Sequence, residues 1–203
     1  MNVNFFGVRG STPCACRELA RYGGNTACVA LEAPGHDPLV FDLGTGLRFW
    51  GETQSQDGSF RGAALVSHMH WDHVQGLPFF VPVLRPGAHL DIYGPPPEEM
   101  SLEAAFRHFL RPPFFPVEIE ALHGEIAFHD LLDDQVVVGD AKVTSRTVPH
   151  VGRTAGYRVE YAGVTVAYVS DHQAPVDGSM EVAESVLELA DGVDLLIHDA
   201  QYT

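Results

Sequence analysis

Four metal-capable side chains lie within six residues near the middle of the sequence. His68, His70, Asp72 and His73 form the pattern H-x-H-x-D-H. Neutral imidazole and carboxylate suit zinc, manganese or iron better than calcium or magnesium. The apolar residues 63–66 come directly before this segment and predict a strand that ends in a ligand-rich turn. His68 and His70 can then point to one side, while Asp72 and His73 follow where the chain turns and can face a second ion.

Two later strand ends carry further candidate ligands. His150 follows Pro149, whose ring stiffens the backbone and presents the imidazole at a fixed angle. Asp171 follows another predicted strand and could supply a carboxylate that bridges two ions. Each residue alone is more often a turn residue or a cap. Together with the H-x-H-x-D-H segment, and in this order, they indicate a site for two metal ions.

The chain length and composition predict one water-soluble domain. The 203 residues, 45% of them apolar, suffice for a single domain over residues 1–203 with a large core. No apolar run approaches the roughly 20 residues of a membrane span, and residues 1–7 lack the features of a signal peptide. Three cysteines are too few and odd in number for a disulfide framework. We therefore expect a cytoplasmic protein without membrane association.

The charge limits the class of partner. Because 27 acidic residues stand against 12 basic ones, the net charge is −15, which makes a long nucleic acid a poor candidate. A small anionic substrate stays compatible with this charge, since bound divalent metal ions would invert the local field.

Alternating strands and helices must position the candidate ligands. Residues 101–110 predict a helix from their apolar spacing, with Ser101 as its N-cap. Residues 179–190 predict a second helix that stops at Gly192. The dipeptide Ala162-Gly163 predicts a hairpin turn. Predicted strands cover residues 3–6, 27–31, 39–41, 63–66, 89–93, 135–138, 142–148, 155–161, 164–169 and 194–197, the last of them buried. This order predicts a layered α/β sandwich with sheets inside and helices outside.

This arrangement of motifs resembles the metallo-β-lactamase superfamily along nearly the whole chain. The resemblance rests on Asp42-Leu43-Gly44-Thr45-Gly46, the H-x-H-x-D-H segment, His150 and Asp171. It implies an αββα four-layer sandwich with the site at the sheet edges, and two divalent metal ions, zinc first and manganese or iron as alternatives. The implied ligands are His68, His70 and His150 for one ion, Asp72 and His73 for the second, and Asp171 between them.

Other segments resemble the phosphodiesterase-type branch of that superfamily, which includes ribonuclease Z and the cyclic phosphodiesterase of phosphonate breakdown. They are residues 6–11, 22–26 and 73–78, with residues 93–95 and 168–171 closer to the second of these enzymes. The branch implies hydrolysis of a small cyclic or linear, nucleotide-like phosphodiester by a metal-bound hydroxide. By that resemblance Asp72 is the catalytic residue that orients the nucleophile, and Asn25 lines the site.

Several residues are candidates for proton transfer and phosphate binding. His172 or His198 could protonate the leaving alkoxide. Asp199 follows His198 at the end of the last predicted strand, where the family often has a supporting His–acid pair. Arg9 and Arg153 could hold the phosphate, since guanidinium matches its geometry.

The chain departs from the family at two places. The phosphonate enzyme binds a structural zinc in its N-terminal loop, but here that loop has only Cys14 and Cys16, and two thiols cannot fill a four-ligand site. Family members also carry a last histidine ligand beyond residues 194–197, whereas this sequence ends at Thr203. We therefore expect the last C-terminal elements to be missing and the second metal site to be incomplete, unless another chain supplies the ligand.

Alternatives of different kinds remain open from the sequence. Hydrolysis of a thioester, lactone or β-lactam would use the same metal motif. An inactive metal-binding module, a sensor or a scaffold, fits the missing last ligand. Ribonuclease Z activity fits the motifs but not the acidic charge. The apolar residues 112–116 predict a lid, a contact in a homodimer or a plug in the core.

Overall fold

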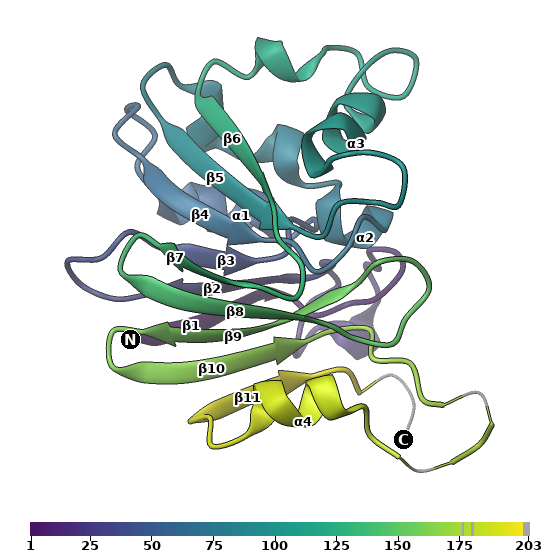
Figure 1. The fold of residues 1–203 in the computed structure, drawn as a ribbon. Helices are drawn as coiled ribbons and strands as arrows, with labels where there is room; N and C mark the ends of the chain where they lie inside the picture. The colour runs from purple at the N-terminus through teal and green to yellow at the C-terminus, as the bar shows by residue number, and fades with distance from the viewer. Residues whose placement is uncertain (176, 180, 201–203) are drawn as a thin grey trace.

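In the computed structural model, two mixed sheets lie face to face and helices cover their outer faces (Figure 1). The structure describes residues 1–175, 177–179 and 181–200. The first sheet has the order β1-β2-β3-β4-β5-β6, and the second has the order β11-β10-β9-β8-β7. Their bounds are β1 (Asn2–Gly7), β2 (Cys28–Glu32), β3 (Leu39–Phe41), β4 (Arg61–Leu65), β5 (His89–Gly94), β6 (Glu125–Asp130), β7 (Gln135–Val138), β8 (Ala141–Thr147), β9 (Ala155–Tyr161), β10 (Val164–Val169) and β11 (Leu195–His198).

The helices are short, and each of the four α-helices buries residues against a sheet. The α-helices are α1 (Leu47–Thr53), α2 (Trp71–Val74), α3 (Leu102–Phe109) and α4 (Glu184–Ala190). The 3-10 helices are η1 (Arg17–Leu19), η2 (Leu77–Phe79), η3 (Val81–Leu84) and η4 (Ile119–Ala121). Residues of α1, α2 and α3 pack on the outer face of the first sheet, and α4 packs on the second. Among the described residues, no helix has the length and apolar character needed to cross a membrane.

The core between the two sheets fixes their relative position. Phe41 of β3 stacks on Tyr168 of β10 with ring centroids 4.6 Å apart, and both rings are buried. Tyr157 of β9 lies in the same core and donates a hydrogen bond of 2.6 Å to the carbonyl of Val66. Aromatic stacking and a buried hydrogen bond across the interface leave little freedom for one sheet to slide on the other.

The topology brings four strand ends to one edge of the sandwich. Strands β3 and β4 are parallel in the first sheet, and β8 and β10 both run antiparallel to β9 in the second, so each pair ends on one side. A hydrogen bond from the Ala155 amide to the Ser67 carbonyl, 2.8 Å long, joins the two sheets at this edge. Residues that follow these four strands therefore converge, as predicted for the candidate ligands.

Most of the predicted elements are confirmed. Strands β1 to β5 and β7 to β10 lie where the sequence places them, within two residues at each end. Both residues of the predicted hairpin turn have positive φ, 50° at Ala162 and 77° at Gly163, as a tight antiparallel turn requires. Helix α3 begins after Ser101, whose hydroxyl accepts a bond from the Ala104 amide.

Other predictions were wrong or incomplete. The helix expected from residue 179 begins only at Glu184. Of the three apolar residues on its predicted face, Val186 and Leu189 are buried, whereas Val182 is exposed and precedes the helix. Residue 180 lies outside the described residues. Strand β11 is half-exposed rather than buried, because it forms the edge of its sheet. The sequence reasoning missed α1, α2 and β6, which are short or begin and end with polar residues.

The apolar loop at residues 112–116 plugs the core with only one of its two rings. Phe115 packs against the outer core and meets Phe79 edge-on at 6.0 Å, whereas Phe114 is 61% exposed. The exposed ring stays available for a ligand or a partner.

Two glycines allow the turn after β3 to touch the turn after α2. The Gly76 amide donates to the Leu43 carbonyl at 2.7 Å, and a Cβ atom at Gly76 would overlap the carbonyl oxygen of Gly44. Because the obstacle is backbone, a larger residue can be accommodated only if one of the two turns moves.

We expect Gly76→Ala to lower the free energy of unfolding by about 3 kcal/mol through this overlap. Gly35→Ala is the control, because its φ is +82° but no atom lies within 4 Å of the added carbon. It should cost about 1 kcal/mol from backbone strain alone. Urea unfolding measures both values. Equal losses would show that the contact between the turns adds nothing to stability.

Candidate metal centre

Three histidines bring one ring nitrogen each to a common point. The Nε2 atom of His68 lies 2.8 Å from Nδ1 of His70, and Nε2 of His150 lies 3.3 Å from the same Nδ1. Their ligand atoms all lie within 4.8 Å of one another. Burial, followed by the field of His73, lowers the pKa of His68 to about 2, so its imidazole is neutral and keeps a lone pair. Three imidazoles whose ring nitrogens converge are a donor set that fits a zinc-type ion.

A second donor set shares His68 with the first. The Nε2 atom of His73 lies 2.9 Å from a carboxylate oxygen of Asp171 and 3.4 Å from one of Asp72. His68, His73 and Asp171 also satisfy the 4.8 Å separation. Because one residue belongs to both sets, the two sets adjoin, which is the arrangement that a pair of bridged ions needs.

The electrostatics of the second set favour a cation. Burial alone would lower the pKa of His73, but Asp42, Asp171 and Asp72 outweigh it and raise that pKa to about 12. Despite its own burial, the pKa of Asp72 lies well below its usual range because of His73. Three carboxylates around one imidazole form a strongly negative site, and a divalent ion held there would take the place of the proton.

Hydrogen bonds to Asp42 hold residues of both donor sets in place. Its side chain is fully buried and accepts four hydrogen bonds. One oxygen accepts from the Ser67 amide at 2.7 Å. The other accepts from the Ser67 hydroxyl at 3.0 Å, from Nδ1 of His73 at 2.8 Å and from the Tyr168 hydroxyl at 2.8 Å. Burial and the Asp42 charge raise the pKa of Tyr168 well above its usual value, so the phenol stays a donor.

These bonds assign the tautomers of two ligands. Since Nδ1 of His73 donates to Asp42, the proton that a divalent ion would replace is the one on Nε2, which faces Asp171, and Nε2 is therefore the donor atom of His73. The Ser67 hydroxyl gives its proton to Asp42 and can therefore accept from Nδ1 of His68 at 3.0 Å, which leaves Nε2 of His68 as the donor atom. Asp42 thus orients one histidine directly and another through a serine.

The N-terminal loop holds the catalytic candidate Asp72. The Ser11 amide donates to its Oδ2 atom at 2.6 Å, across 61 positions of sequence. Asp72 lies in the first turn of α2, two residues after His70, and its side chain is buried. The predicted residues His68, His70, Asp72, His73, His150 and Asp171 are therefore brought together. However, β4 ends at Leu65, so His68 and His70 lie in the turn beyond the strand rather than at its last positions.

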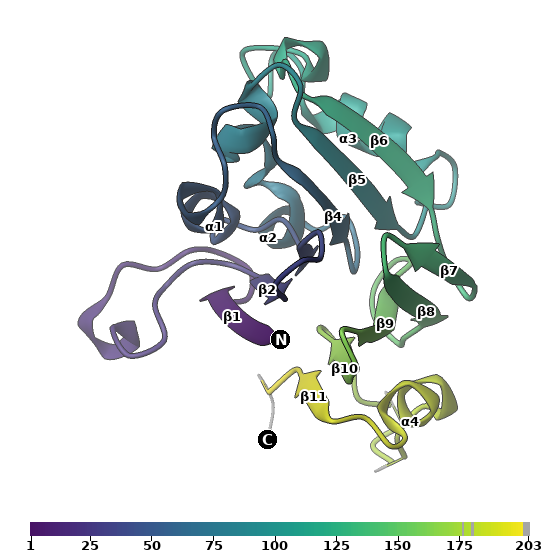
Figure 2. The ribbon, with the colours of Figure 1, turned by 90° about the vertical axis from the view of Figure 1, so that its left-hand side faces the viewer.

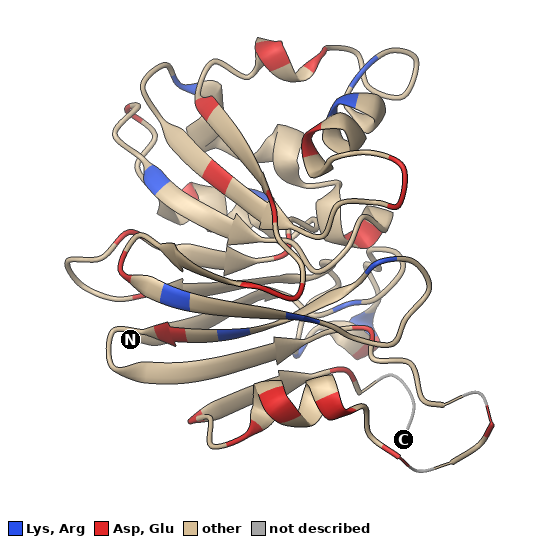
Figure 3. Ribbon diagram, in the orientation of Figure 1, with Lys and Arg blue, Asp and Glu red and all other residues tan. Residues whose placement is uncertain are grey.

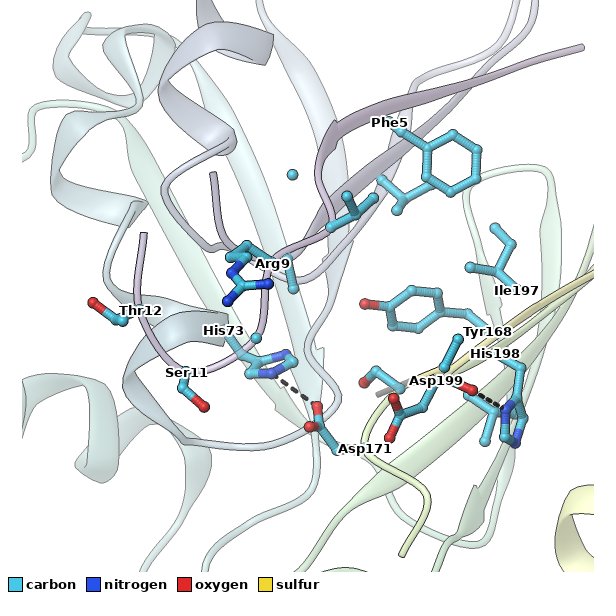
Figure 4. A pocket seen from close by; sticks show the side chains of 18 residues that line it. Phe5, Arg9, Ser11, Thr12, His73, Tyr168, Asp171, Ile197, His198 and Asp199 are labelled. Atoms are coloured by element: carbon cyan, nitrogen blue, oxygen red, sulfur yellow. Dashed lines mark hydrogen bonds and ion pairs between the residues drawn. The ribbon is translucent and has the colours of Figure 1, made fainter. Parts of the chain in front are cut away.

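Strand β1 lies opposite β10 and β11 (Figure 2). A pocket of about 580 Å³, lined by residues of these strands, opens beside the second donor set (Figure 4). Arg9, His73, Asp171, His198 and Asp199 line it. His172 lies at its edge, where Nδ1 is 3.1 Å from Nε2 of His198.

Two other candidates lie elsewhere. Asn25 is not among the lining residues of that pocket; its side chain donates to the Phe6 carbonyl and accepts from the Thr45 hydroxyl, so it supports the loop. Arg153 donates to the Pro96 carbonyl at 3.3 Å outside the pocket.

The two loop cysteines form no metal site with a third ligand. The sulfur atoms of Cys14 and Cys16 are 3.3 Å apart, but among the residues that the structure describes no third His, Cys, Asp or Glu joins them. Cys28 is buried in β2, and burial raises the pKa of its thiol.

Comparison with known proteins assigns the family. The family model named beta-lactamase superfamily domain matches residues 50–203. This chain belongs to the beta-lactamase superfamily. The predicted superfamily and its fold of two sheets with outer helices are therefore confirmed. Such a fold implies divalent metal binding, and both donor sets fit it.

Several relatives of this chain are named ribonuclease Z. It is 30% identical to ribonuclease Z of Prochlorococcus marinus over 166 residues, which are 79% of this chain and 48% of the relative. It is 29% identical over 180 residues to an uncharacterized protein of Mycobacterium bovis, covering 85% of this chain and 60% of that one. The chain thus spans about half to three fifths of the length of these relatives.

Solved structures share the fold at lower identity. A diphosphatase from the PhnP family superposes with a TM-score of 0.68 at 19% identity, over 96% of this chain and 72% of that one. The short form of human tRNase Z gives 0.67 at 19% identity, over 100% and 79%. At these identities the likeness concerns the fold.

We expect Asp42→Asn to weaken binding of the second metal ion by about 10- to 100-fold, because Asn cannot hold His73 with the same charge and geometry. Metal titration followed by competition with a chelating dye measures this. Tyr168→Phe is the matched control, since it removes one donor to Asp42 but keeps the bond to His73. It should cost about 1 kcal/mol of stability and leave metal affinity close to that of the original chain. Equal loss of affinity in both variants would contradict the role of Asp42.

Proposed function

We propose that this protein is a metal-dependent hydrolase of small phosphodiesters that uses two divalent ions, with zinc as the first candidate. One observation carries the proposal: the His68–His70–His150 set adjoins the His68–His73–Asp171 set. The relatives named ribonuclease Z support phosphodiester chemistry. When bound, such ions would activate a water molecule near neutral pH and neutralise the phosphate oxygens.

The described residues can divide the work among them. His68, His70 and His150 would hold one ion, and Asp72 and His73 the other. Asp171 would bridge the two ions, since it belongs to the set that shares His68 with the first. Asp72 has one oxygen fixed by the Ser11 amide, so its orientation toward the nucleophile is set before substrate arrives. This preorganisation makes Asp72 the residue that would orient the attacking water.

A pair of histidines at the pocket could supply the proton for the leaving group. Nδ1 of His198 lies 2.7 Å from its acceptor, the Asp199 carbonyl, and this bond directs Nε2 toward His172. Burial, followed by the field of His198, lowers the pKa of His172. A proton shared between the two rings can move to an alkoxide that leaves on this side of the pocket.

Arg9 is the cation best placed for an anionic substrate. It lines the pocket with His73 and Asp171, and among the described residues it forms no ion pair. Figure 3 shows basic residues scattered among many acidic ones, so no broad basic face competes for the anion. A local guanidinium beside the metal centre suits a small phosphodiester better than a long nucleic acid.

Chelation of the metal ions should abolish hydrolysis of bis(para-nitrophenyl) phosphate, and added zinc should restore it. Asp72→Ala should lower kcat by at least about 100-fold, because the nucleophile loses its orienting group. Asp91→Ala is the control, since Asp91 is a half-buried carboxylate that bonds His89 and His129 on β5 and β6, outside the site.

The outcome of these assays separates the alternatives. Close to two ions per chain with diester turnover supports the proposal. Turnover of thioesters, lactones or β-lactams alone would assign the site to that chemistry instead. One bound ion with no turnover would make the protein a metal-binding module.

Arg9→Ala should raise the KM for the diester by about tenfold or more, because a charge-assisted bond to the phosphate is lost. Arg153→Ala is the control, since this exposed arginine donates to the Pro96 carbonyl and is not a lining residue of the pocket. Steady-state kinetics on both variants at low salt checks the assignment. A larger effect from Arg153→Ala would place the phosphate on the opposite side of the centre.

A further inference from the structure

A second pocket, of about 250 Å³, lies between α2, α3 and the loop after α3. Its walls are mainly apolar and include Met69, Trp71, Met100, Phe109 and Phe114. This volume is smaller than that of a site for a whole drug-sized ligand, so it suits one ring system. No residue of this pocket belongs to the two donor sets.

This pocket and the metal centre lie on two sides of one turn. Met69 lies between His68 and His70 in the sequence. Trp71 lies between His70 and Asp72, in the first turn of α2. The ligands point toward the sheet edge, whereas Met69 and Trp71 face the pocket. The pocket therefore adjoins the ligand turn, one residue along the backbone from His68, His70 and Asp72.

The aromatic surfaces of this pocket are unusually exposed. Trp71 is 60% exposed and Phe114 is 61% exposed, although both are large and apolar. The ring of Phe109 meets Trp71 edge-on at 5.4 Å, which fixes the indole and leaves its outer surface open. Exposed aromatic surface that is held in place beside a polar site marks a place for a ligand.

A cationic group lies at the rim. His108 lines the pocket, and Nη2 of Arg111 lies 3.2 Å from its Nδ1 atom. Within the described ranges, Arg111 pairs with no carboxylate, in contrast to Arg107, which bonds Glu103 and Glu120. Aromatic walls together with a guanidinium are the combination that binds nucleotides, through stacking on the base and attraction of the anion.

We propose that this pocket binds the nucleobase of a phosphodiester substrate, with the base stacked on Trp71 and Phe114 beside it. The inference rests on the proposed function, since it assumes that the phosphate lies at the metal centre. It narrows the substrate class to nucleotide diesters and makes Trp71 a specificity residue.

Two diesters with the same leaving group test the inference: the para-nitrophenyl ester of thymidine monophosphate and methyl para-nitrophenyl phosphate. The metal-loaded protein should prefer the nucleoside diester in KM. Trp71→Ala should reduce that preference by about tenfold, the size that base stacking contributes, and Trp71→Phe should retain most of it. Phe114→Ala should act in the same direction, at a position far from the ligands in sequence.

Phe79→Ala is the matched control, since Phe79 is 55% exposed and lies outside the pocket. It should leave the preference unchanged. If the original chain shows no preference, or if Trp71→Ala affects both diesters equally, the inference is wrong. If neither diester is hydrolysed, the proposed function fails, and a binding measurement still decides the pocket.

Tryptophan fluorescence supplies that measurement. The chain has two tryptophans, and Trp50 is fully buried against Phe80, so ligand-dependent quenching reports on Trp71. Thymidine monophosphate should quench the emission, ribose phosphate should not, and Trp71→Ala should remove the response. A dimer that dissociates on Trp71→Ala and Phe114→Ala, with no nucleotide quenching, would assign this face to a subunit contact and overturn the inference.

Discussion

The buried carboxylate of Asp42 is the constraint on which the site depends. A charge without solvent costs several kcal/mol unless its oxygens are satisfied. Here four donors satisfy it. They come from the turn after β4, helix α2 and strand β10, which lie 25 to 126 positions from Asp42 in the sequence. Folding both sheets is therefore required to satisfy one carboxylate, and satisfying it fixes His73 and, through Ser67, His68. The hydrogen bonds to Asp42 thus couple the metal centre to the core.

Part of the free-energy cost of placing these carboxylates is backbone strain at the ends of two strands. Asp42 and Asp171 both have positive φ, 58° and 49°, which is uncommon for residues other than glycine but more frequent for aspartate. Each follows a strand, β3 in one sheet and β10 in the other, so each chain direction changes abruptly where a carboxylate is needed. Strained residues persist when their surroundings determine them, and these two side chains are held by His73 from opposite sides.

The sequence predicted the convergence of the candidate ligands well, because four of the six lie within one short segment. Three histidines and an aspartate within six residues are recognisable as a metal-binding pattern. His150 and Asp171 are recognisable as polar residues at the ends of apolar strands. The strands with alternating or β-branched residues were equally clear. By contrast, the role of Asp42 was not predicted, since its three partner residues lie up to 126 positions away in the sequence. Ser67, Ser11 and Tyr168 were missed for the same reason: each looks ordinary until the two sheets meet. The end of α4 toward the N-terminus was misplaced because Val182, apolar in sequence, is exposed.

The ligand turn also explains why the site has two chemically different neighbourhoods. A segment that ends a strand and begins a helix must alternate its side chains between the sheet edge and the outer surface. His68, His70 and Asp72 take the first direction, and Met69 and Trp71 take the second. Because the same few backbone bonds position both sets, a change that shifts the metal ligands also shifts the aromatic surface. If the aromatic surface binds substrate as proposed, substrate selection and metal binding are therefore not independent: a change in either also affects the packing of α2 against the turn after β3, where Leu43 and Gly76 meet.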